Sequence, residues 1–179
     1  MAASAVSAAN EVKIERAHGL LWTTVCAKGQ SFHFVIDTGA SITVLSPEAA
    51  RRLDMPWGRP TRVEAIGGTA RGYQSSEFPG LLAGLALPSK VLVMDLSDPS
   101  RSCGRVIDGL IGADFFQGKI AQLDYQAGTL RFLDCVPAGK NAVPSRFESG
   151  VVCVRLAPAG AKAGWVRLDT GCTDALHWT

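Results

Sequence analysis

The stretch that decides the fold is Phe34-Val35-Ile36-Asp37-Thr38-Gly39-Ala40-Ser41. An apolar run that ends in Asp-Thr-Gly predicts a buried strand followed by a tight loop that carries an aspartate. The same tripeptide recurs 132 residues later as Asp169-Thr170-Gly171, again after a short strand-like segment at 165–168. One copy is a weak signal, because these residues are common where strands turn, but two copies in matching contexts favour a shared role.

Around the first motif, short apolar segments alternate with Gly, Pro and Asp turns from Val12 to Asp134. This pattern predicts an all-β lobe that is mostly antiparallel and has one or two short helices. A helix is expected over 46–53, because Ser46 is a good N-cap and Pro47 fits the first helical position. A glycine-punctuated apolar turn at 106–117 leads into one further helical turn. Strands are expected at 20–25, 32–36, 62–66, 71–75, 90–96, 119–125 and 129–133.

The chain divides into four parts by composition. Residues 1–11 form a flexible Ala-rich tail, 12–135 form the lobe around Asp37, 136–148 form a linker rich in Pro, Gly and polar residues, and 149–179 begin a second lobe. In this last part, the order of strand, turn, strand and Asp-Thr-Gly repeats that of the first lobe. Because no second glycine-tipped hairpin follows in this sequence, we expect the second lobe to be incomplete.

Charge and residue types argue against several classes of partner. The formal net charge is only +2, and Lys and Arg are scattered, so neither nucleic acid nor an anionic membrane surface is expected as a partner. The longest apolar stretch, 80–87, is far shorter than the roughly 20 residues of a membrane-spanning helix. The five cysteines include no Cys-x-x-Cys pair and the three histidines have no metal-ligand spacing, so we expect neither a metal nor a cofactor.

The cellular compartment stays open at the level of the sequence. The Ala-rich start is similar to the cleavage region of a secretory signal, but it lacks a basic region and a long apolar core. It is either the remnant of a trimmed signal, which implies a periplasmic or secreted protein, or an ordinary start, which leaves the cytoplasm open. An odd number of cysteines is compatible with disulfides and with buried free thiols.

Two aspartates at the ends of two such strands offer a specific chemistry. Like charges about 3 Å apart cannot both ionise cheaply, so a facing pair shares one proton near its working pH. The ionised member can take a proton from water while the protonated member polarises a carbonyl group. The glycine of each motif lets two backbone loops approach closely, and each threonine hydroxyl can donate to and accept from the opposite loop.

The first lobe resembles a known family. Residues 34–41, followed by Thr43-Val44-Leu45, resemble the first active-site segment of retropepsin-like aspartic peptidases, the pepsin and retropepsin clan in its bacterial form. The segment 65–70, Ala-Ile-Gly-Gly-Thr-Ala, is similar to the glycine-rich flap hairpin of retroviral proteases. The segment 108–115 resembles the apolar-apolar-Gly turn and short helix that close each lobe. The likeness covers the whole of 12–134 and implies a closed, barrel-like sheet.

The resemblance implies an aspartic endopeptidase that hydrolyses polypeptides and needs no metal or cofactor. The catalytic carboxylates would be Asp37 and Asp169. The residues that lock the two loops would be Thr38, Gly39, Thr170 and Gly171, the substrate-binding flap would comprise Ile66, Gly67, Gly68 and Thr69, and the support under the loop would comprise Leu110, Ile111 and Gly112. The second motif departs from the family pattern, because Cys172 follows it and Arg167 stands where the first strand has an apolar residue.

Two questions remain open from the sequence. The first is how the pair forms. Either Asp37 meets Asp169 within one longer natural chain, of which this is a truncated form, or two chains pair about a two-fold axis so that Asp37 meets its own copy. The alternative function is a catalytically inactive retropepsin-like module that binds peptides or a protein partner.

Overall fold

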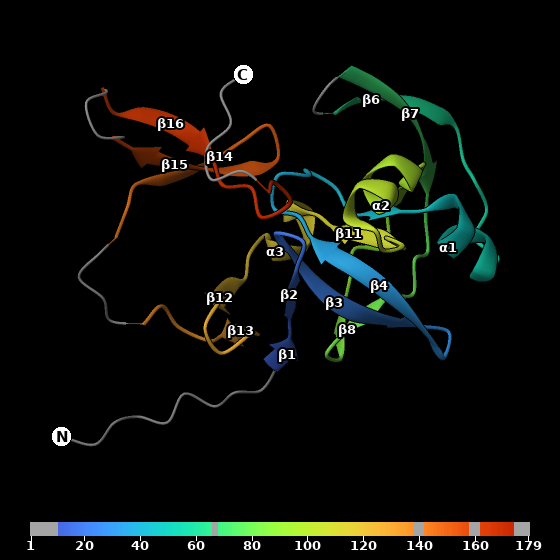
Figure 1. Ribbon diagram of the computed structural model, residues 1–179, viewed down its shortest axis with the longest axis horizontal. Coiled ribbons are helices and arrows are strands. Elements are labelled where there is room, and N and C mark those ends of the chain that lie inside the picture. The colour runs from blue at the N-terminus through green and yellow to red at the C-terminus, as the bar shows by residue number, and fades with distance from the viewer. Residues whose placement is uncertain (1–10, 66–67, 138–141, 158–161, 174–179) are drawn as a thin grey trace.

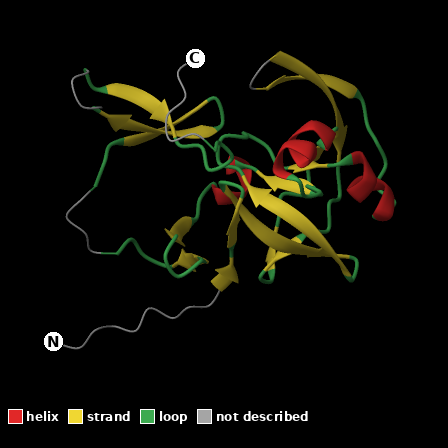
Figure 2. Ribbon diagram, in the orientation of Figure 1, coloured by secondary structure: helices red, strands yellow, loops and turns green. Residues whose placement is uncertain are grey.

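The computed structural model describes residues 11–65, 68–137, 142–157 and 162–173 (Figures 1 and 2). The helices in these ranges are α1 Pro47–Arg52, α2 Ser97–Cys103 and α3 Ala113–Phe116. The strands are β1 Glu11–Lys13, β2 Glu15–Ala17, β3 Leu20–Ala27, β4 Gln30–Ile36, β5 Val44–Leu45, β6 Pro60–Ala65, β7 Gly68–Ser75, β8 Leu81–Leu82, β9 Leu85–Ala86, β10 Val91–Met94, β11 Gly109–Ile111, β12 Ile120–Asp124, β13 Thr129–Leu133, β14 Ser145–Glu148, β15 Val151–Leu156 and β16 Gly164–Arg167. None of these helices has the length and apolar character needed to cross a bilayer.

A ten-stranded sheet forms the body of the first lobe. Its strand order is β6-β7-β10-β5-β11-β4-β3-β8-β9, with β2 added beside β3. Most neighbours are antiparallel, but β11 runs parallel to β4 and β10 runs parallel to β5. The expected all-β, mostly antiparallel class is therefore confirmed. The expected closure into a barrel is wrong for the described residues, because the strand pairings there form an open path whose end strands, β6 and β9, do not pair with each other.

The end of β4 that leads to Asp37, residues 34–36, is buried on both faces. Phe34 and Ile36 belong to the larger apolar cluster on one face, and Val35 belongs to a second cluster with Trp22 on the other face. The Phe34 ring stacks on Phe78 with 6.1 Å between ring centroids. A strand enclosed in this way has little freedom to move, so the loop that follows it is held firmly.

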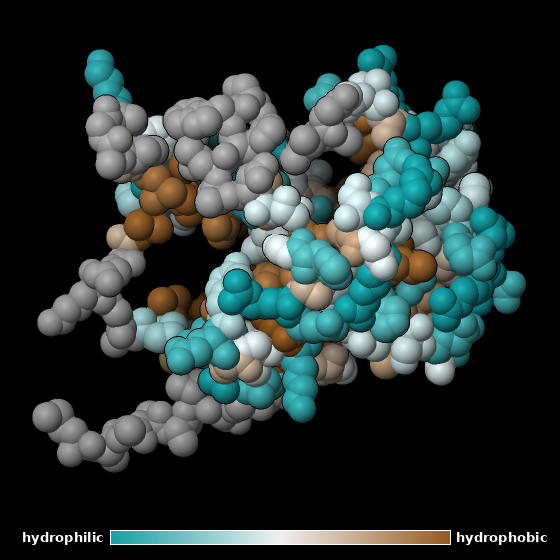
Figure 3. Space-filling view, viewed as in Figure 1, coloured by the Kyte–Doolittle hydropathy of each residue, from teal (hydrophilic) through white to brown (hydrophobic). Residues whose placement is uncertain are grey.

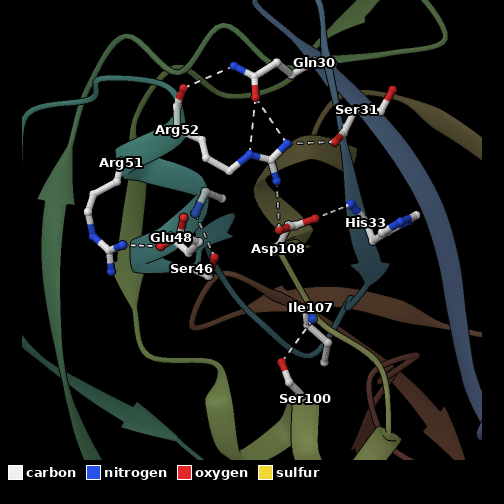
Figure 4. A network of polar contacts seen from close by, with 11 residues as sticks. Gln30, Ser31, His33, Ser46, Glu48, Arg51, Arg52, Ser100, Ile107 and Asp108 are labelled. Atoms are coloured by element: carbon white, nitrogen blue, oxygen red, sulfur yellow. Dashed lines mark hydrogen bonds and ion pairs between the residues drawn. The ribbon is translucent and has the colours of Figure 1, made fainter.

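A polar network fixes α1 against this sheet (Figure 4). The Ser46 hydroxyl caps α1 by accepting from the Ala49 amide, as the sequence predicts. At the other end of the helix, the Arg52 guanidinium lies 3.7 Å from the buried carboxylate of Asp108 and stacks over Phe32. The same carboxylate accepts from the His33 amide at 2.8 Å, so one aspartate links α1, β4 and the segment that enters β11.

The structure also contains elements that the sequence pattern does not reveal. The helix α2 has no apolar periodicity from which it could be predicted, and the strands β5, β8 and β9 have only two residues each. The strand β1 pairs with β13 in a separate sheet of order β1-β13-β12, across more than a hundred residues of sequence. The strand β14 lies at the end of the range predicted as a linker.

The C-terminal part forms a third sheet of order β14-β15-β16. One face packs against the first lobe through Val151 and Cys153, which form a small buried cluster with Ala113. The register puts the side chains of Phe147 and Leu156 on the opposite face, where they are 54% and 42% exposed, and Leu168, just beyond β16, is 48% exposed. Figure 3 shows brown, hydrophobic atoms gathered over this sheet. In this third sheet, β15 and β16 therefore repeat the strand order of β3 and β4 without the buried core that covers those strands.

A pair of glycine substitutions tests the packing of the active-site strand. A methyl group at Gly109, in β11, would overlap the Phe34 ring and the Val44 carbonyl oxygen, whereas one at Gly164, in β16, would meet no atom within 4 Å. We expect Gly109→Ala to lower the free energy of unfolding by about 1–3 kcal/mol. Gly164→Ala should change it by less than about 1 kcal/mol. Urea unfolding of both variants measures the difference, and equal stabilities would contradict this account of the core.

Candidate active site

Asp37 lies at the point where β4 ends. Its amide donates to the Ile111 carbonyl at 2.9 Å, which continues the parallel pairing of β4 with β11. Its carboxylate oxygen Oδ1 accepts from the amides of Gly39 and Ala40 at 3.0 and 3.1 Å. The loop therefore folds back over its own aspartate and fixes the orientation of the carboxyl group.

Asp169 follows β16 in the same local arrangement, and its Oδ1 accepts from the Gly171 amide at 2.9 Å. The two loops approach each other through their glycines. A methyl group at Gly39 would overlap the carboxyl of Asp169, and one at Gly171 would overlap the carboxyl of Asp37. Each carboxyl group thus lies against the glycine of the other motif, and the structure brings both aspartates together within one chain.

Thr38 and Thr170 join the two loops by reciprocal hydrogen bonds. The Thr38 amide donates to the Thr170 hydroxyl, and the Thr170 amide donates to the Thr38 hydroxyl, both at 3.1 Å. The Thr38 hydroxyl donates onward to the Leu168 carbonyl, and the Thr170 hydroxyl donates to the Ile36 carbonyl, both at 2.7 Å. Each hydroxyl both donates and accepts across the interface, so removing one leaves an amide and a carbonyl of the opposite segment without that partner.

The environment of Asp37 favours its protonated form. Burial is the largest cause, the neighbouring charge of Asp169 is the next, and together they raise the pKa of Asp37 to about 6. The amides of Ala40 and Gly39 stabilise the carboxylate and act in the opposite direction, but they offset only part of the shift. A carboxyl group of this kind can hold a proton at mildly acidic pH, which is the requirement for a shared-proton pair.

Of the predicted support residues, Ile111 and Gly112 contact the segment 37–43, and Leu110 pairs with Val35 and Val44. Ile111 accepts the Asp37 amide, and a methyl group at Gly112 would overlap the backbone of Ile42 and Thr43. Sequence reasoning missed Asp114, whose carboxylate accepts from the Thr43 amide at 3.0 Å and from the Thr43 hydroxyl at 2.8 Å. The signal was an acidic residue two positions after the glycine of the apolar-apolar-Gly turn.

The predicted flap corresponds to the hairpin of β6 and β7, which projects from the sheet in Figure 1. Ile66 and Gly67 lie outside the described residues. Gly68 begins β7 with a φ of 143°, and Thr69 is exposed one residue later. On the hairpin's other strand, Val63 packs against the cluster that contains Val35. The hairpin therefore contacts the same face of the sheet as the residue two positions before Asp37.

Comparison with known proteins identifies the family. A family model described as aspartyl protease matches residues 23–115, which is just over half of the chain. The chain belongs to the aspartyl protease family. A search of curated proteins found no match. In the part of the chain that the structure describes, no three His, Cys, Asp or Glu side chains lie together as metal ligands would.

Replacing a threonine by valine tests the reciprocal hydrogen bonds. Thr38→Val keeps the shape of the side chain but removes the hydroxyl that accepts from Thr170 and donates to Leu168. We expect the loop at 169–171 to open more readily, by about 0.5–1.5 kcal/mol, because the half-buried Thr170 amide and the exposed Leu168 carbonyl lose their partner. Hydrogen–deuterium exchange of the Thr170 amide measures this opening. Thr38→Ser, which keeps the hydroxyl, is the control, and equally slow exchange in the valine variant would rule out the lock.

The raised pKa of Asp37 predicts how stability depends on pH. The folded protein binds this proton more tightly than the unfolded chain, because the pKa rises from 3.8 to about 6 on folding. The contribution is therefore fully present below about pH 4 and is lost as the pH rises through about 6, a loss of roughly 3 kcal/mol. Urea unfolding at several pH values should show this decline in the wild type relative to Asp37→Asn. A difference that stays constant between pH 4 and 7 would contradict the assignment.

Proposed function

We propose that this protein is an aspartic endopeptidase that hydrolyses peptide bonds with a water molecule activated between Asp37 and Asp169. The observation that carries the proposal is the reciprocal packing of the two motifs, in which each glycine lies against the carboxyl group of the other aspartate. Family membership and the raised pKa of Asp37 support the same chemistry.

In the proposed reaction, the pair holds one proton, and Asp37 is its carrier in the free enzyme because burial favours its neutral form. Asp169, ionised, takes a proton from the water as the water oxygen attacks the carbonyl carbon of the peptide. Asp37 donates its proton to the carbonyl oxygen, which gives a neutral tetrahedral diol. Asp169 then gives its proton to the amide nitrogen while Asp37 takes one from a diol hydroxyl. The C–N bond breaks, a carboxylic acid and an amine leave, and the pair again holds one proton on Asp37.

The substrate in this proposal is an extended polypeptide that lies beneath the hairpin of β6 and β7. The hairpin contributes Ile66, Gly67, Gly68 and Thr69 at its tip as the flap. An extended peptide can pair its main chain with such a hairpin and place alternate side chains toward the sheet. Val35 and Val44 are core residues, 1% and 4% exposed, and support the strand that carries Asp37.

The same proposal assigns both aspartates to one chain. Thr38 and Thr170 hold the two loops together, and Val151 and Cys153 anchor the third sheet on Ala113 of the first lobe. These contacts support an intramolecular pair over a symmetric dimer in which Asp37 meets its own copy. The lobe of 12–135, the linker of 136–148 and the partial second lobe of 149–179 remain the proposed division of the chain.

Substitution of the two aspartates tests the proposal. Asp37→Asn and Asp169→Asn should each reduce cleavage of a denatured protein by at least about 100- to 10,000-fold, because each removes one member of the acid–base pair. Asp54→Asn is the matched control, since Asp54 is exposed and its φ of 47° suits asparagine equally well. Cleavage is followed at mildly acidic pH with and without pepstatin.

The outcomes separate the arrangements. Loss of cleavage in both active-site variants, with Asp54→Asn unchanged, supports the intramolecular pair. Loss in Asp37→Asn alone favours the symmetric dimer, and a mass measurement in solution then has to show two chains. Absence of cleavage in the wild type would overturn the peptidase proposal for this chain.

A further inference from the structure

Two tight turns occupy equivalent places in the two halves of the molecule. One joins β2 to β3 through His18 and Gly19, with φ values of 55° and 77°, and the other joins β14 to β15 through Ser149 and Gly150, with φ values of 51° and 80°. Two consecutive residues with positive φ are typical of the type I′ turn, which closes a hairpin sharply. In each half the hairpin is followed by one more paired strand and then by an Asp-Thr-Gly loop. The turns therefore belong to the repeat that also contains the two aspartates.

Each turn packs against the loop that follows the opposite motif. A methyl group built on Gly150 would lie 2.9 Å from the Cβ of Ser41, and one built on Gly19 would lie 3.2 Å from the Cγ2 of Thr173. Both contacted residues stand four positions after the aspartate of their own motif. The turn of the second half thus contacts the first loop, and the turn of the first half contacts the second loop, with little room for a side chain at either glycine.

Other turns of the same type make no such contact. Lys28 and Gly29, between β3 and β4, have φ values of 46° and 73°, and Ala83 and Gly84, between β8 and β9, have φ values of 48° and 81°. A methyl group on either of these glycines would meet no heavy atom within 4 Å. Close packing against another segment is therefore not a property of the turn type. Among these four turns it is confined to the two that lie beside the aspartate loops.

The contact at Gly150 affects the separation of the two halves. The first loop is fixed on its other side, where the Ala113 amide donates to the Ala40 carbonyl at 2.7 Å. Because this loop has little freedom, a group inserted between Ser41 and Gly150 would displace the third sheet. Asp169 would move with that sheet, so the spacing at the turn also sets the spacing of the two carboxyl groups.

The contact at Gly19 acts on the same interface from the other half. The turn leads directly into β3, whose first three residues, Leu20, Leu21 and Trp22, are 6%, 3% and 1% exposed. The turn is therefore anchored in the core of the first lobe. A group inserted at Gly19 would displace Thr173, and with it the end of the second aspartate loop.

We propose that Gly19 and Gly150 are positioning residues of the reaction: each turn holds the aspartate loop of the opposite half, so that the two carboxyl groups stay close enough to share one proton. This inference rests on the proposed peptidase function. The turns form a second pair of contacts between the halves, in addition to the hydrogen bonds of Thr38 and Thr170. A shared proton requires carboxyl groups about 3 Å apart, so a displacement of about 1 Å is enough to slow the reaction.

Alanine at each glycine tests the inference, and Gly29→Ala is the matched control. All three variants introduce the same backbone strain, because a methyl group disfavours positive φ, but only Gly19→Ala and Gly150→Ala insert that group between the halves. We expect these two variants to lower kcat by about 10- to 100-fold and to change KM by less than about 3-fold. Gly29→Ala should keep kcat within about 2-fold of the wild-type value.

Second substitutions separate the contact from the strain. Ser41→Gly removes the atom that a methyl group at Gly150 would meet, and Thr173→Gly removes the side chain that one at Gly19 would meet. Gly150→Ala/Ser41→Gly should match the kcat of Ser41→Gly within about 2-fold, and Gly19→Ala/Thr173→Gly should match Thr173→Gly equally well. The crossed pair Gly150→Ala/Thr173→Gly should stay slow. A variant that folds only with its matching second substitution also supports the contact, whereas strain alone predicts no rescue.

The pH profile provides a readout that a loss of stability alone would not move. Burial, and after it the charge of Asp169, raises the pKa of Asp37 to about 6. Moving the halves apart admits water and separates the charges, so both causes weaken and the pKa of Asp37 falls. The proposed mechanism needs Asp37 protonated, and the alkaline limb of kcat/KM should therefore move to lower pH in Gly19→Ala and Gly150→Ala. The limb of Gly29→Ala should coincide with that of the wild type.

Hydrogen–deuterium exchange of the Thr170 amide separates this inference from the peptidase proposal, because it does not depend on cleavage. Exchange should be faster in Gly19→Ala and Gly150→Ala than in Gly29→Ala, since a displaced interface weakens the bond from this amide to Thr38. Wild-type cleavage with equal kcat in all three variants overturns the positioning role and leaves the peptidase proposal standing. Absence of wild-type cleavage, with faster exchange in the two interface variants, overturns the peptidase proposal and retains the reciprocal contacts. Equal exchange in all three variants overturns the contacts in either case.

Discussion

The structure depends on the close approach of two loops that each carry a carboxyl group. Only glycine permits this approach, because at Gly39 and Gly171 a methyl group would occupy the space of the opposite carboxyl. Mutual repulsion of two carboxylates would push the loops apart, and the four hydrogen bonds of Thr38 and Thr170 oppose that repulsion. The threonines therefore supply the restraint that a shared-proton pair requires, and the glycines supply the space.

The first lobe provides the environment that this pair needs. The strand β4 has apolar clusters on both faces, and its last residue, Ile36, is 2% exposed. Such a strand positions Asp37 firmly and also withdraws water from it, and the second effect is the main reason for its raised pKa. The burial of this strand thus accounts both for the fixed position of Asp37 and for its raised pKa. A change that loosens the core beneath β4 is expected to disturb the protonation of Asp37 as well as the stability of the lobe.

Most of the first lobe was accessible from sequence because its signals are local. Ser46 and Pro47 mark the start of α1, and the apolar run before Asp37 marks β4. The pairing of β1 with β13 was not accessible, because a three-residue strand has no pattern and its partner lies far along the chain. At the site, the Asp-Thr-Gly repeat identified the residues that meet. The role of Asp114 was not predicted. Its carboxylate accepts from Thr43, but in the sequence it is only an acidic residue at the start of a helix, which is common.

The two halves of the pair are not equivalent, and this asymmetry bears on the proposed mechanism. Asp37 follows a strand whose last three residues are buried and accepts from two amides, whereas Asp169 follows a strand in which Trp165 is 40% exposed. In a symmetric dimer the two aspartates would have the same surroundings, and neither would be favoured as the carrier of the shared proton. Within one chain the surroundings differ from the outset. In the proposed mechanism, this difference in surroundings is what assigns the acid to Asp37 and the base to Asp169.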